Sequence, residues 1–437
     1  CRKSEFGPVD RTSGNADFTK YIAVGNSLTQ GYQDGGVYAE GQQQSYPSII
    51  AQQMMVVDPN MGDFNQPEVF GNGSGYMHLE YIDGEIEIIS PGDPGGYEAE
   101  GWDTWGTVIP NYYNNMGISG VTLMQCVALD DNEKTVNNII MNGAEISIFP
   151  PPAPPFEIEA LNPFGRFLDW GGSPLDGGTP IQYVDHIRNS GATFFTNWLG
   201  NNDVLGYATA GGVSTEFDAS LLGLGVISIG TISDPTEFKM KYDSVLTAFK
   251  SNGAEGICAT IPDVTAIPFF NTFTIQSLKD DFGYTEVWIE DYNGDARIAT
   301  DADLILLSAK DTIDQGAGGS EVNNLPNNLV LDAWEVSECQ SGTVAINAAI
   351  KASAGEHNYP VLDMHAFVNM VKGGSVFDGV DINADYISGG GFSLDGIHLN
   401  PRGYAIVANE FIEAINDHYE SNIPKVAIAN YRGIVYP

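Results

Sequence analysis

The sequence predicts an α/β fold built on a parallel sheet. Short apolar runs alternate along the chain with segments of helical periodicity, and each run ends at a turn rich in Gly, Pro or polar residues. Strands that alternate with helices join in parallel, because the helix carries the chain back to the same end of the sheet. We therefore predict a doubly wound sheet of five strands, at residues 20–25, 112–118, 192–198, 256–261 and 359–364.

Helical segments fall between and after these strands. Residues 42–57 carry apolar side chains on one face, and Pro47 suits the first turn of a helix. Asp234 is placed to cap a second helix that runs to about residue 252, with Pro235 in its first turn. The same patterns predict further helices at residues 121–129, 180–190, 343–354 and 404–415.

Two segments interrupt the alternation of strands and helices. Residues 58–110 are rich in Gly, acidic and aromatic residues, and residues 268–330 likewise do not fit a strand of the central sheet. We predict a polar N-terminal tether at 1–19, one α/β domain at 20–420 that carries both insertions, and a C-terminal extension at 421–437.

Both insertions contain hairpin signals. Alternating residues at 81–89 predict a β-hairpin in the first. In the second, Asn293-Gly294 is a turn signal between predicted strands at 286–289 and 304–307. Residues 365–394, by contrast, indicate a long Gly-rich loop.

Acidic residues of the second insertion do not make a calcium loop. The segment Asp291-x-Asn293-x-Asp295 has the spacing of such a loop, but Ala296 and Ala302 stand where the loop needs Gly and Glu. The chain also has no Cys-x-x-Cys and no His-Glu-x-x-His motif. We expect no metal and no organic cofactor.

The net charge of the chain limits the classes of partner that it can bind. Its 437 residues include 18 Lys and Arg against 57 Asp and Glu, for a formal net charge of −39. Such a surface repels phosphate backbones and anionic lipid head groups. We therefore expect no nucleic-acid partner, and we expect any membrane contact to be covalent or apolar.

Cys1 stands where a bacterial lipoprotein carries its lipid after removal of a signal peptide, and the polar residues 2–5 suit a tether. We expect lipidation of Cys1 and an extracytoplasmic location in the cell envelope, with Cys1 at a boundary of the cloned sequence as the alternative. The other cysteines, Cys126, Cys258 and Cys339, are too scattered for a disulfide framework.

Ser27 is the first candidate for chemistry. It lies between Gly25 and Gly31 directly after the first predicted strand, where a turn exposes its hydroxyl. A Ser hydroxyl needs a base, a group that orients the base, and donors for an oxyanion. Asp395 and His398 precede a predicted helix, and a tight turn there can place the carboxylate on Nδ1 and aim Nε2 outward.

Ligand sites of doubly wound sheets lie at the carboxyl ends of the strands. Ser27, Gly120, Asn202 and the segment 395–398 all fall there by our assignment. His365 follows the last strand and is a rival base, but we expect it to be structural.

Four stretches together resemble the SGNH hydrolases, also called GDSL esterases and lipases. In the order of that family they are Gly25-Asn26-Ser27-Leu28, Ser119-Gly120, Gly200-Asn201-Asn202-Asp203 and Asp395-Gly396-Ile397-His398. The resemblance covers residues 20–415 and implies a flavodoxin-like α/β/α sandwich. One departure is Asn26, where the family usually has Asp, and the uncharged amide leaves the nucleophile in a less negative setting.

The resemblance also implies roles for individual residues. Ser27 would be the nucleophile, His398 its base, and Asp395 the group that orients His398. The backbone N–H groups of Ser27 and Gly120 and the side-chain amide of Asn202 would form the oxyanion hole.

The resemblance implies a serine ester hydrolase that acts through an acyl-enzyme, on an acyl lipid or a short-chain ester. Three alternatives stay open: a carbohydrate O-acetyl esterase, an acyltransferase, and a non-catalytic surface-binding lipoprotein. The apolar segment 221–232 could line an acyl groove or a lid, whereas Tyr97, Trp102 and Trp105 could stack on sugar rings. Ordinary packing explains both groups equally well.

Overall fold

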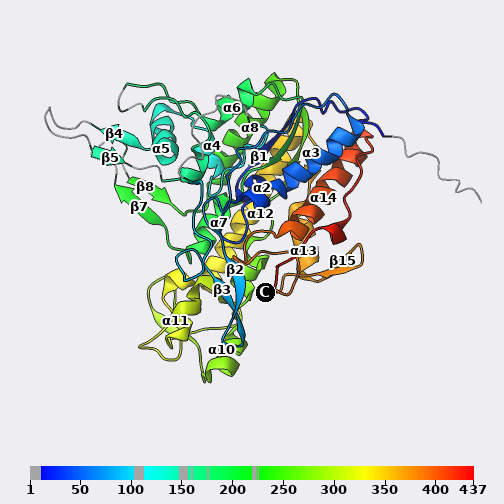
Figure 1. Ribbon diagram of the computed structural model, residues 1–437. Coiled ribbons are helices and arrows are strands. Elements are labelled where there is room, and N and C mark those ends of the chain that lie inside the picture. Colours follow the sequence, from blue (N-terminus) through cyan, green and yellow to red (C-terminus); the bar gives the residue numbers. More distant parts are fainter. Residues whose placement is uncertain are drawn as a thin grey trace, which may run out of the picture.

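The computed structural model describes residues 11–102, 113–146, 156–158, 161–173, 175, 177–218, 224 and 226–437 (Figure 1). Cys1, Trp105 and part of the segment 221–232 lie outside these residues, so the predictions that concern them stay predictions. Within the described part of the chain, no helix is both long and apolar enough to span a membrane.

A parallel sheet of four strands forms the centre of the molecule. The strands lie in the order β1, β6, β9, β14, and each is paired in parallel with its neighbour. Their bounds are Tyr21–Gly25, Phe194–Trp198, Glu255–Ala259 and Val361–Leu362. The predicted α/β class with a parallel sheet is confirmed.

The predicted fifth strand at 112–118 is wrong in its extent. Its described part, from residue 113, runs beside β1 with one parallel bridge, between Ala23 and Asn115. Ala23 donates its N–H to the Asn114 carbonyl at 2.7 Å and accepts from the Met116 N–H at 2.9 Å. The side-chain amide of Asn115 donates to the Thr29 carbonyl at 2.8 Å. This segment therefore contacts both β1 and the turn that comes after β1.

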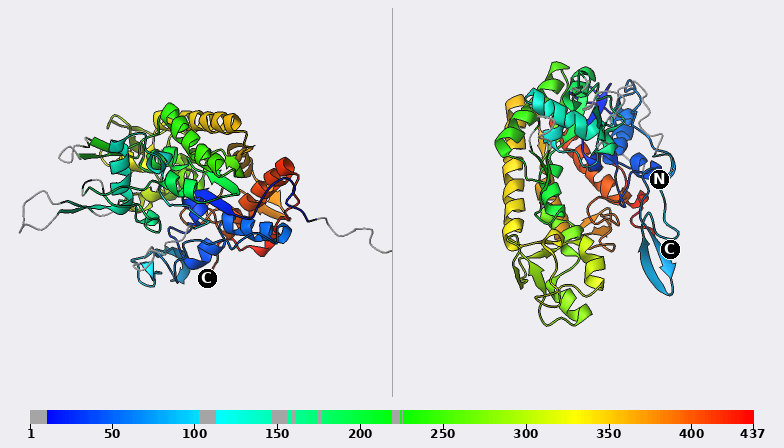
Figure 2. Two further views of the ribbon diagram at one scale, coloured as in Figure 1. Left: turned by 90° about the horizontal axis from the view of Figure 1, so that it is seen from above. Right: turned by 90° about the vertical axis from the view of Figure 1, so that its left-hand side faces the viewer.

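Helices cover both faces of the sheet (Figure 2). Tyr21 and Ala23 of β1 point to one face, and Ile22 and Val24 to the other, because successive side chains of a strand alternate. The first face packs against α3 (Tyr46–Val57) and α14 (Pro401–Tyr419), and the second against α8 (Pro235–Ser251) and α12 (Ala333–His357). The result is a three-layer arrangement with a separate core on each side of the sheet.

The other α-helices of the described residues are shorter. They are α1 (Ser27–Gln30), α2 (Ala39–Gln43), α4 (Leu123–Cys126), α5 (Asp131–Asn142), α6 (Tyr183–Asn189), α7 (Asn202–Thr209), α9 (Pro268–Asn271), α10 (Ile275–Phe282), α11 (Lys310–Asp314) and α13 (Met364–Lys372). Helix α12 starts ten residues before the predicted 343, since the Asp332 side chain accepts from the N–H groups of Trp334 and Glu335 and caps it there. Helix α13 occupies part of the segment predicted to be a loop.

Antiparallel pairs of short strands make up the other sheets of the described residues. They are β2 (His78–Ile82) with β3 (Glu85–Ile89), β4 (Ala144–Ile146) with β5 (Phe156–Ile158), β7 (Thr215–Asp218) with β8 (Val226–Ile229), β10 (Trp288–Glu290) with β11 (Ala296–Ile298), β12 (Leu304–Ile305) with β13 (Val330–Leu331), and β15 (Ser375–Phe377) with β16 (Val380–Ile382). The turn at Asn293-Gly294 joins β10 to β11, so the predicted pairing with 304–307 is wrong.

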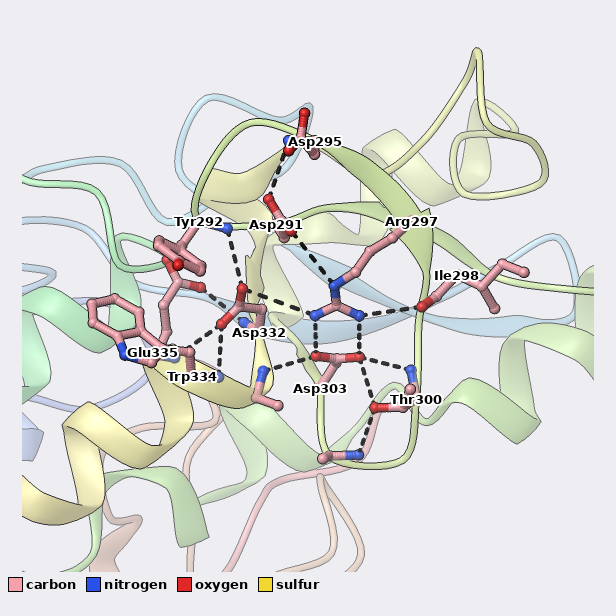
Figure 3. A network of polar contacts seen from close by, with 12 residues as sticks. Asp291, Tyr292, Asp295, Arg297, Ile298, Thr300, Asp303, Asp332, Trp334 and Glu335 are labelled. Carbon is pink, nitrogen blue, oxygen red and sulfur yellow. Dashed lines mark hydrogen bonds and ion pairs between the residues drawn. The ribbon is translucent and has the colours of Figure 1, made fainter.

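A polar network joins the second insertion to the start of α12 (Figure 3). Arg297 donates two hydrogen bonds to the Asp303 carboxylate, at 2.8 and 2.6 Å, and Asp303 also accepts from the Ala333 N–H at 2.8 Å. Burial would raise the pKa of Asp303, but the hydrogen bonds from Arg297 and Thr300 outweigh burial and hold this pKa below its usual range. Asp303 therefore links β11, through Arg297, to the start of α12, through Ala333.

We expect Arg297→Leu to lower the free energy of unfolding by about 3 to 5 kcal/mol, because the substitution leaves the buried Asp303 carboxylate without its cation. Urea denaturation measures the change. Lys310→Leu is the matched control, since it removes an exposed pair with Asp314 that contributes at most about 1 kcal/mol. Equal effects of the two substitutions would contradict this account of the network.

Candidate active site

Ser27 begins α1 directly after β1. A Cβ at Gly25 would collide with the Thr29 side chain, so glycine allows the helical turn to fold back tightly against the strand. The Ser27 carbonyl accepts from the N–H groups of Gly31 and Tyr32 at 3.0 Å, which closes the turn. Ser27 itself is 6% exposed. Its hydroxyl is thereby held at the carboxyl end of β1.

His398 and Asp395 approach Ser27 from the loop that precedes α14. The Ser27 Oγ lies 2.8 Å from His398 Nε2, and His398 Nδ1 lies 2.9 Å from Asp395 Oδ2. The Tyr32 ring packs against the imidazole with its centroid at 4.6 Å. The three residues that the sequence predicts as nucleophile, base and orienting group therefore form one hydrogen-bonded row.

Several donors hold the Asp395 carboxylate in place. Oδ1 accepts from the N–H groups of Ile397 and His398 at 2.8 Å, and Oδ2 accepts from the Gly35 N–H at 3.0 Å. Burial alone would raise the pKa of Asp395, but the charge of His398 and these hydrogen bonds outweigh burial and hold the pKa well below its usual range. The carboxylate is thus ionised and fixed in orientation beside the imidazole.

The predicted oxyanion donors line the cleft that contains this hydroxyl. Within the described residues, the backbone N–H groups of Ser27 and Gly120 donate to no protein acceptor. The side-chain amide of Asn202 donates one N–H to the Val121 carbonyl at 2.8 Å, which leaves its second N–H available. Gly120 has φ +76°, which a residue with a side chain rarely adopts. Ser27, Gly120 and Asn202 all line one cleft, so the structure brings the predicted donors together.

Two residues singled out in the sequence differ in their surroundings. Asn26 is fully buried, and neither atom of its amide has a hydrogen-bond partner among the described residues. Because its amide is neutral, Asn26 adds no charge next to Ser27. His365 lies on α13, where its ring contacts Asn369 at 3.5 Å. It does not line the cleft that contains Ser27, and the structural role expected for it stays a prediction.

The cleft that contains Ser27 and His398 has a volume of about 700 Å³. Part of its lining is apolar and comes from α5, α7 and β8, including Ile140, Leu205 and Ile227. Polar side chains such as Gln125 and Asn162 line another part. The cleft can therefore hold a molecule of mixed polarity against the Ser27 hydroxyl.

The sequence did not indicate the residues that support this site. Gln30, buried on α1, accepts from the backbone N–H of Ser119 at 2.8 Å and from its hydroxyl at 2.7 Å, and so fixes the turn that presents Gly120. Phe269, in the second insertion, donates its N–H to the Gly396 carbonyl at 2.9 Å. These contacts join segments far apart in the chain, and no local motif marks them.

The buried Asp203 side chain hydrogen-bonds to the segments that contain Leu123 and Ser233. Its carboxylate accepts from the Leu123 N–H at 2.8 Å and from the Ser233 hydroxyl at 2.7 Å. Burial raises the pKa of Asp203 to about 6, because these hydrogen bonds compensate only part of the lost hydration. Asp203 directly follows Asn202, the predicted oxyanion donor, so these hydrogen bonds fix the chain beside that residue.

We expect Asp203 to make stability depend on pH. Its folded-state pKa of about 6 lies above the unfolded value, so the folded state binds the proton more tightly. The contribution to the free energy of unfolding is therefore fully present below about pH 4 and falls by about 3 kcal/mol as the pH rises past 6. In Asp203→Asn the amide can still accept from Leu123 and donate to Ser233, but it does not titrate.

Urea denaturation of wild type and Asp203→Asn at several pH values tests this expectation. The free energy of unfolding of the variant minus that of wild type should rise by about 3 kcal/mol from pH 4 to pH 7.5. Stability curves that stay parallel over this range would show that Asp203 has no raised pKa.

The parallel α/β fold, with a hydroxyl, an imidazole and a carboxylate in one hydrogen-bonded row at the strand ends, is typical of serine hydrolases. Comparison of the sequence with models of protein families identifies the family within this class. The model of the GDSL-like lipase/acylhydrolase family matches residues 21–411, and the chain belongs to this family. The protein is accordingly a hydrolase.

Two solved structures show distant similarity over most of the chain. One is LAE5, an α/β hydrolase enzyme from the metagenome of Lake Arreo, Spain, with 11% identity and a TM-score of 0.36 over 92% of this chain and 96% of that one. The other is a lipase/acylhydrolase from Enterococcus faecalis, with 9% identity and a TM-score of 0.32 over 93% and 100%. No curated protein matches the chain in sequence.

Proposed function

We propose that the protein hydrolyses carboxylic esters through an acyl-enzyme on Ser27. The observation that carries the proposal is the row of two hydrogen bonds, 2.8 Å from Ser27 Oγ to His398 Nε2 and 2.9 Å from His398 Nδ1 to Asp395. A base with this geometry takes the proton of a Ser hydroxyl, and the family supplies the ester-cleaving chemistry.

The reaction proceeds in two halves. His398 Nε2 takes the proton of Ser27 while Oγ attacks the ester carbonyl carbon, and the ionised Asp395 stabilises the imidazolium. The negative carbonyl oxygen is bound by the N–H groups of Ser27 and Gly120 and by the Asn202 amide. The C–O bond to the alcohol breaks as His398 returns the proton to the alcohol oxygen. Water then attacks the acyl-enzyme with His398 as base, which frees the acid and restores Ser27.

Hydrolysis of p-nitrophenyl acetate and p-nitrophenyl octanoate by the full chain tests the proposal. We expect release of p-nitrophenol that stops after treatment with a fluorophosphonate, which reacts with activated serines. A folded protein that cleaves neither ester would instead support the non-catalytic binding protein on the same fold.

We expect Asn202→Ala to lower kcat by about 10² to 10³, because it removes one donor to the developing oxyanion. KM should change much less, since the donor binds the transition state more strongly than the ester ground state. Steady-state kinetics on p-nitrophenyl acetate measure both constants. Loss of activity through KM alone would place Asn202 in substrate binding and not in the oxyanion hole.

A further inference from the structure

A tight turn at residues 33–36 follows α1 and contacts the loop before α14. Gln33 and Gly36 exchange two backbone hydrogen bonds of 3.0 Å, and between them Asp34 and Gly35 have φ values of +52° and +79°. Two positive φ values in succession are the pattern of a type I′ turn. Because its backbone conformation is well defined, this turn can hold groups of another segment at fixed positions.

Both oxygens of the Asp395 carboxylate are connected to this turn. The Gly35 N–H donates to Oδ2 at 3.0 Å. The Asp34 N–H donates to the Ser393 hydroxyl at 3.0 Å, and this hydroxyl donates to Oδ1 of Asp395, also at 3.0 Å. The turn therefore acts on the carboxylate both directly and through Ser393, and a rotation of the carboxylate would break one of the two connections.

The Asp34 side chain joins the turn to the same loop. Asp34 is buried, its Oδ1 accepts from the Leu394 N–H at 2.9 Å, and its Oδ2 accepts from the Tyr38 hydroxyl at 2.8 Å. Leu394 directly precedes Asp395. Without the Asp34 carboxylate, the N–H of the buried Leu394 would lack a hydrogen-bond partner, so the loop would shift to regain one.

The residue before the turn contacts the imidazole. The Tyr32 hydroxyl donates to the Gly35 carbonyl at 2.6 Å, and the Tyr32 ring lies against His398 with the ring centroids 4.6 Å apart. The segment 32–36 therefore contacts both the imidazole and the carboxylate beside it. Since this segment follows Ser27 closely in sequence, one short stretch of chain carries the proposed nucleophile and holds its two partners.

We propose that Asp34 is a positioning residue which, through its hydrogen bonds and together with Ser393, holds the Asp395 carboxylate where it orients His398 toward Ser27. The inference rests on the proposed function, because it concerns the same three groups. Asp34 does not line the cleft, so it acts on the reaction only through Asp395. Small displacements of the carboxylate lower the rate strongly, since proton transfer depends on the alignment of the base.

Asp34→Gly gives the first test. Glycine adopts a positive φ without strain, so the turn is kept and only the side chain is lost. We expect kcat for p-nitrophenyl acetate, and the rate constant for fluorophosphonate labelling of Ser27, to fall by about 10- to 100-fold. KM should stay within about twofold of wild type, because the cleft is unchanged. Steady-state kinetics and mass spectrometry of the labelled protein measure these constants.

Asp378→Gly is the matched control. Asp378 has φ +49° in the turn between β15 and β16, and its carboxylate accepts from the Ile428 N–H at 3.0 Å. The substitution thus also removes a carboxylate that joins a tight turn to a distant segment, but at a turn that does not line the cleft. This variant should keep wild-type rates. A loss equal to that of Asp34→Gly would overturn the assignment.

Asp34→Asn tests whether the hydrogen bonds suffice. Asn tolerates a positive φ, its Oδ1 can accept from the Leu394 N–H, and its amide can donate to the Tyr38 hydroxyl. Burial raises the pKa of Asp34, so the folded protein disfavours a charge at this position. We expect this variant to keep the labelling rate within about threefold of wild type. A loss as large as that of Asp34→Gly would contradict positioning through hydrogen bonds.

The decisive test repeats Asp34→Gly in a protein that already carries Asp395→Asn. A residue that acts only through the Asp395 carboxylate has nothing left to position there, so the labelling rate should fall by less than about twofold more. The same further loss as in the wild-type background would show that Asp34 only supports the fold. Ser393→Ala, which removes the link between the Asp34 N–H and Asp395 Oδ1, takes the place of Asp34→Gly if that variant does not fold.

Labelling also separates this inference from the proposed function. If wild type is labelled on Ser27 and the folded Asp34→Gly and Ser393→Ala variants react equally fast, the positioning role is wrong and the hydrolase proposal stands. If folded wild type is not labelled on Ser27, the proposed function fails, and the positioning role fails with it.

Discussion

Replacement of Ser27 by alanine should lower kcat for p-nitrophenyl acetate by about 10⁴-fold or more. The substitution removes the Oγ that we propose as the acceptor of the acyl group, and neither His398 nor the proposed oxyanion donors can replace it. The fold should persist, because the row of hydrogen bonds loses only the contact at 2.8 Å between Oγ and Nε2. Kinetic assays together with thermal denaturation measure both effects.

Ser45 provides the matched control. It is also buried, and its hydroxyl has no hydrogen-bond partner among the described residues. Ser45→Ala should therefore keep wild-type kcat. Comparable losses in both serine variants would mean that the effect of Ser27→Ala comes from packing and not from chemistry.

Asp395→Asn should lower kcat by about 10⁴-fold. An amide at this position cannot fix His398 in the tautomer that leaves Nε2 free to accept the Ser27 proton, and it cannot stabilise the imidazolium by charge. The amide nitrogen would also face donors, since both carboxylate oxygens of Asp395 accept hydrogen bonds. The measurement is kcat at several pH values, together with urea denaturation.

The same substitution should change how stability responds to acid. The pKa of Asp395 is lowered in the folded state, so this carboxylate contributes stability above its unfolded pKa of about 4, and the contribution is lost as the pH falls through its folded pKa. The deficit of Asp395→Asn should thus be largest above about pH 4 and shrink below it. Asp417→Asn, on the exposed side of α14, should change neither kcat nor stability. A variant of Asp395 with wild-type kcat would rule out its role in orienting His398.

The central part of the site could be predicted from sequence because its residues stand beside local signals. Ser27 follows a buried strand, and Asp395 and His398 lie in a short turn before the helix that Asn400 caps through the Gly403 N–H. Parallel strands bring their carboxyl ends to one edge, so such turns meet even when they are far apart in the chain. The roles assigned to these residues stay predictions until activity is measured.

The support of the site could not be predicted in the same way. The Gln30 side chain reaches Ser119 and the Gly35 N–H reaches Asp395, and both contacts depend on how closely elements pack. The second insertion looked like an addition to the fold, yet Phe269 in it contacts Gly396, in the loop that carries Asp395 and His398. Close approach of this kind follows from tertiary packing, which a local pattern does not encode.

In the fold, too, elements with strong local patterns could be predicted, whereas features set by tertiary packing could not. Long periodic helices and buried strands were predicted near their true bounds, as α8 and β6 illustrate. The strand predicted at 359–364 shrinks to the two residues of β14 at the edge of the sheet. Hairpin partners in the second insertion were assigned wrongly, because the pairing of β12 with β13 spans a long connection with its own helix α11.

Covalent labelling of the full chain with a fluorophosphonate, followed by mass spectrometry of its peptides, tests whether Ser27 is the nucleophile. We expect one adduct, on the peptide that contains Ser27, and none in Ser27→Ala. Its formation should slow strongly in Asp395→Asn, since the nucleophile then lacks a correctly oriented base. An unlabelled wild-type protein, or an adduct on a different serine, would contradict the assignment of Ser27 as the nucleophile.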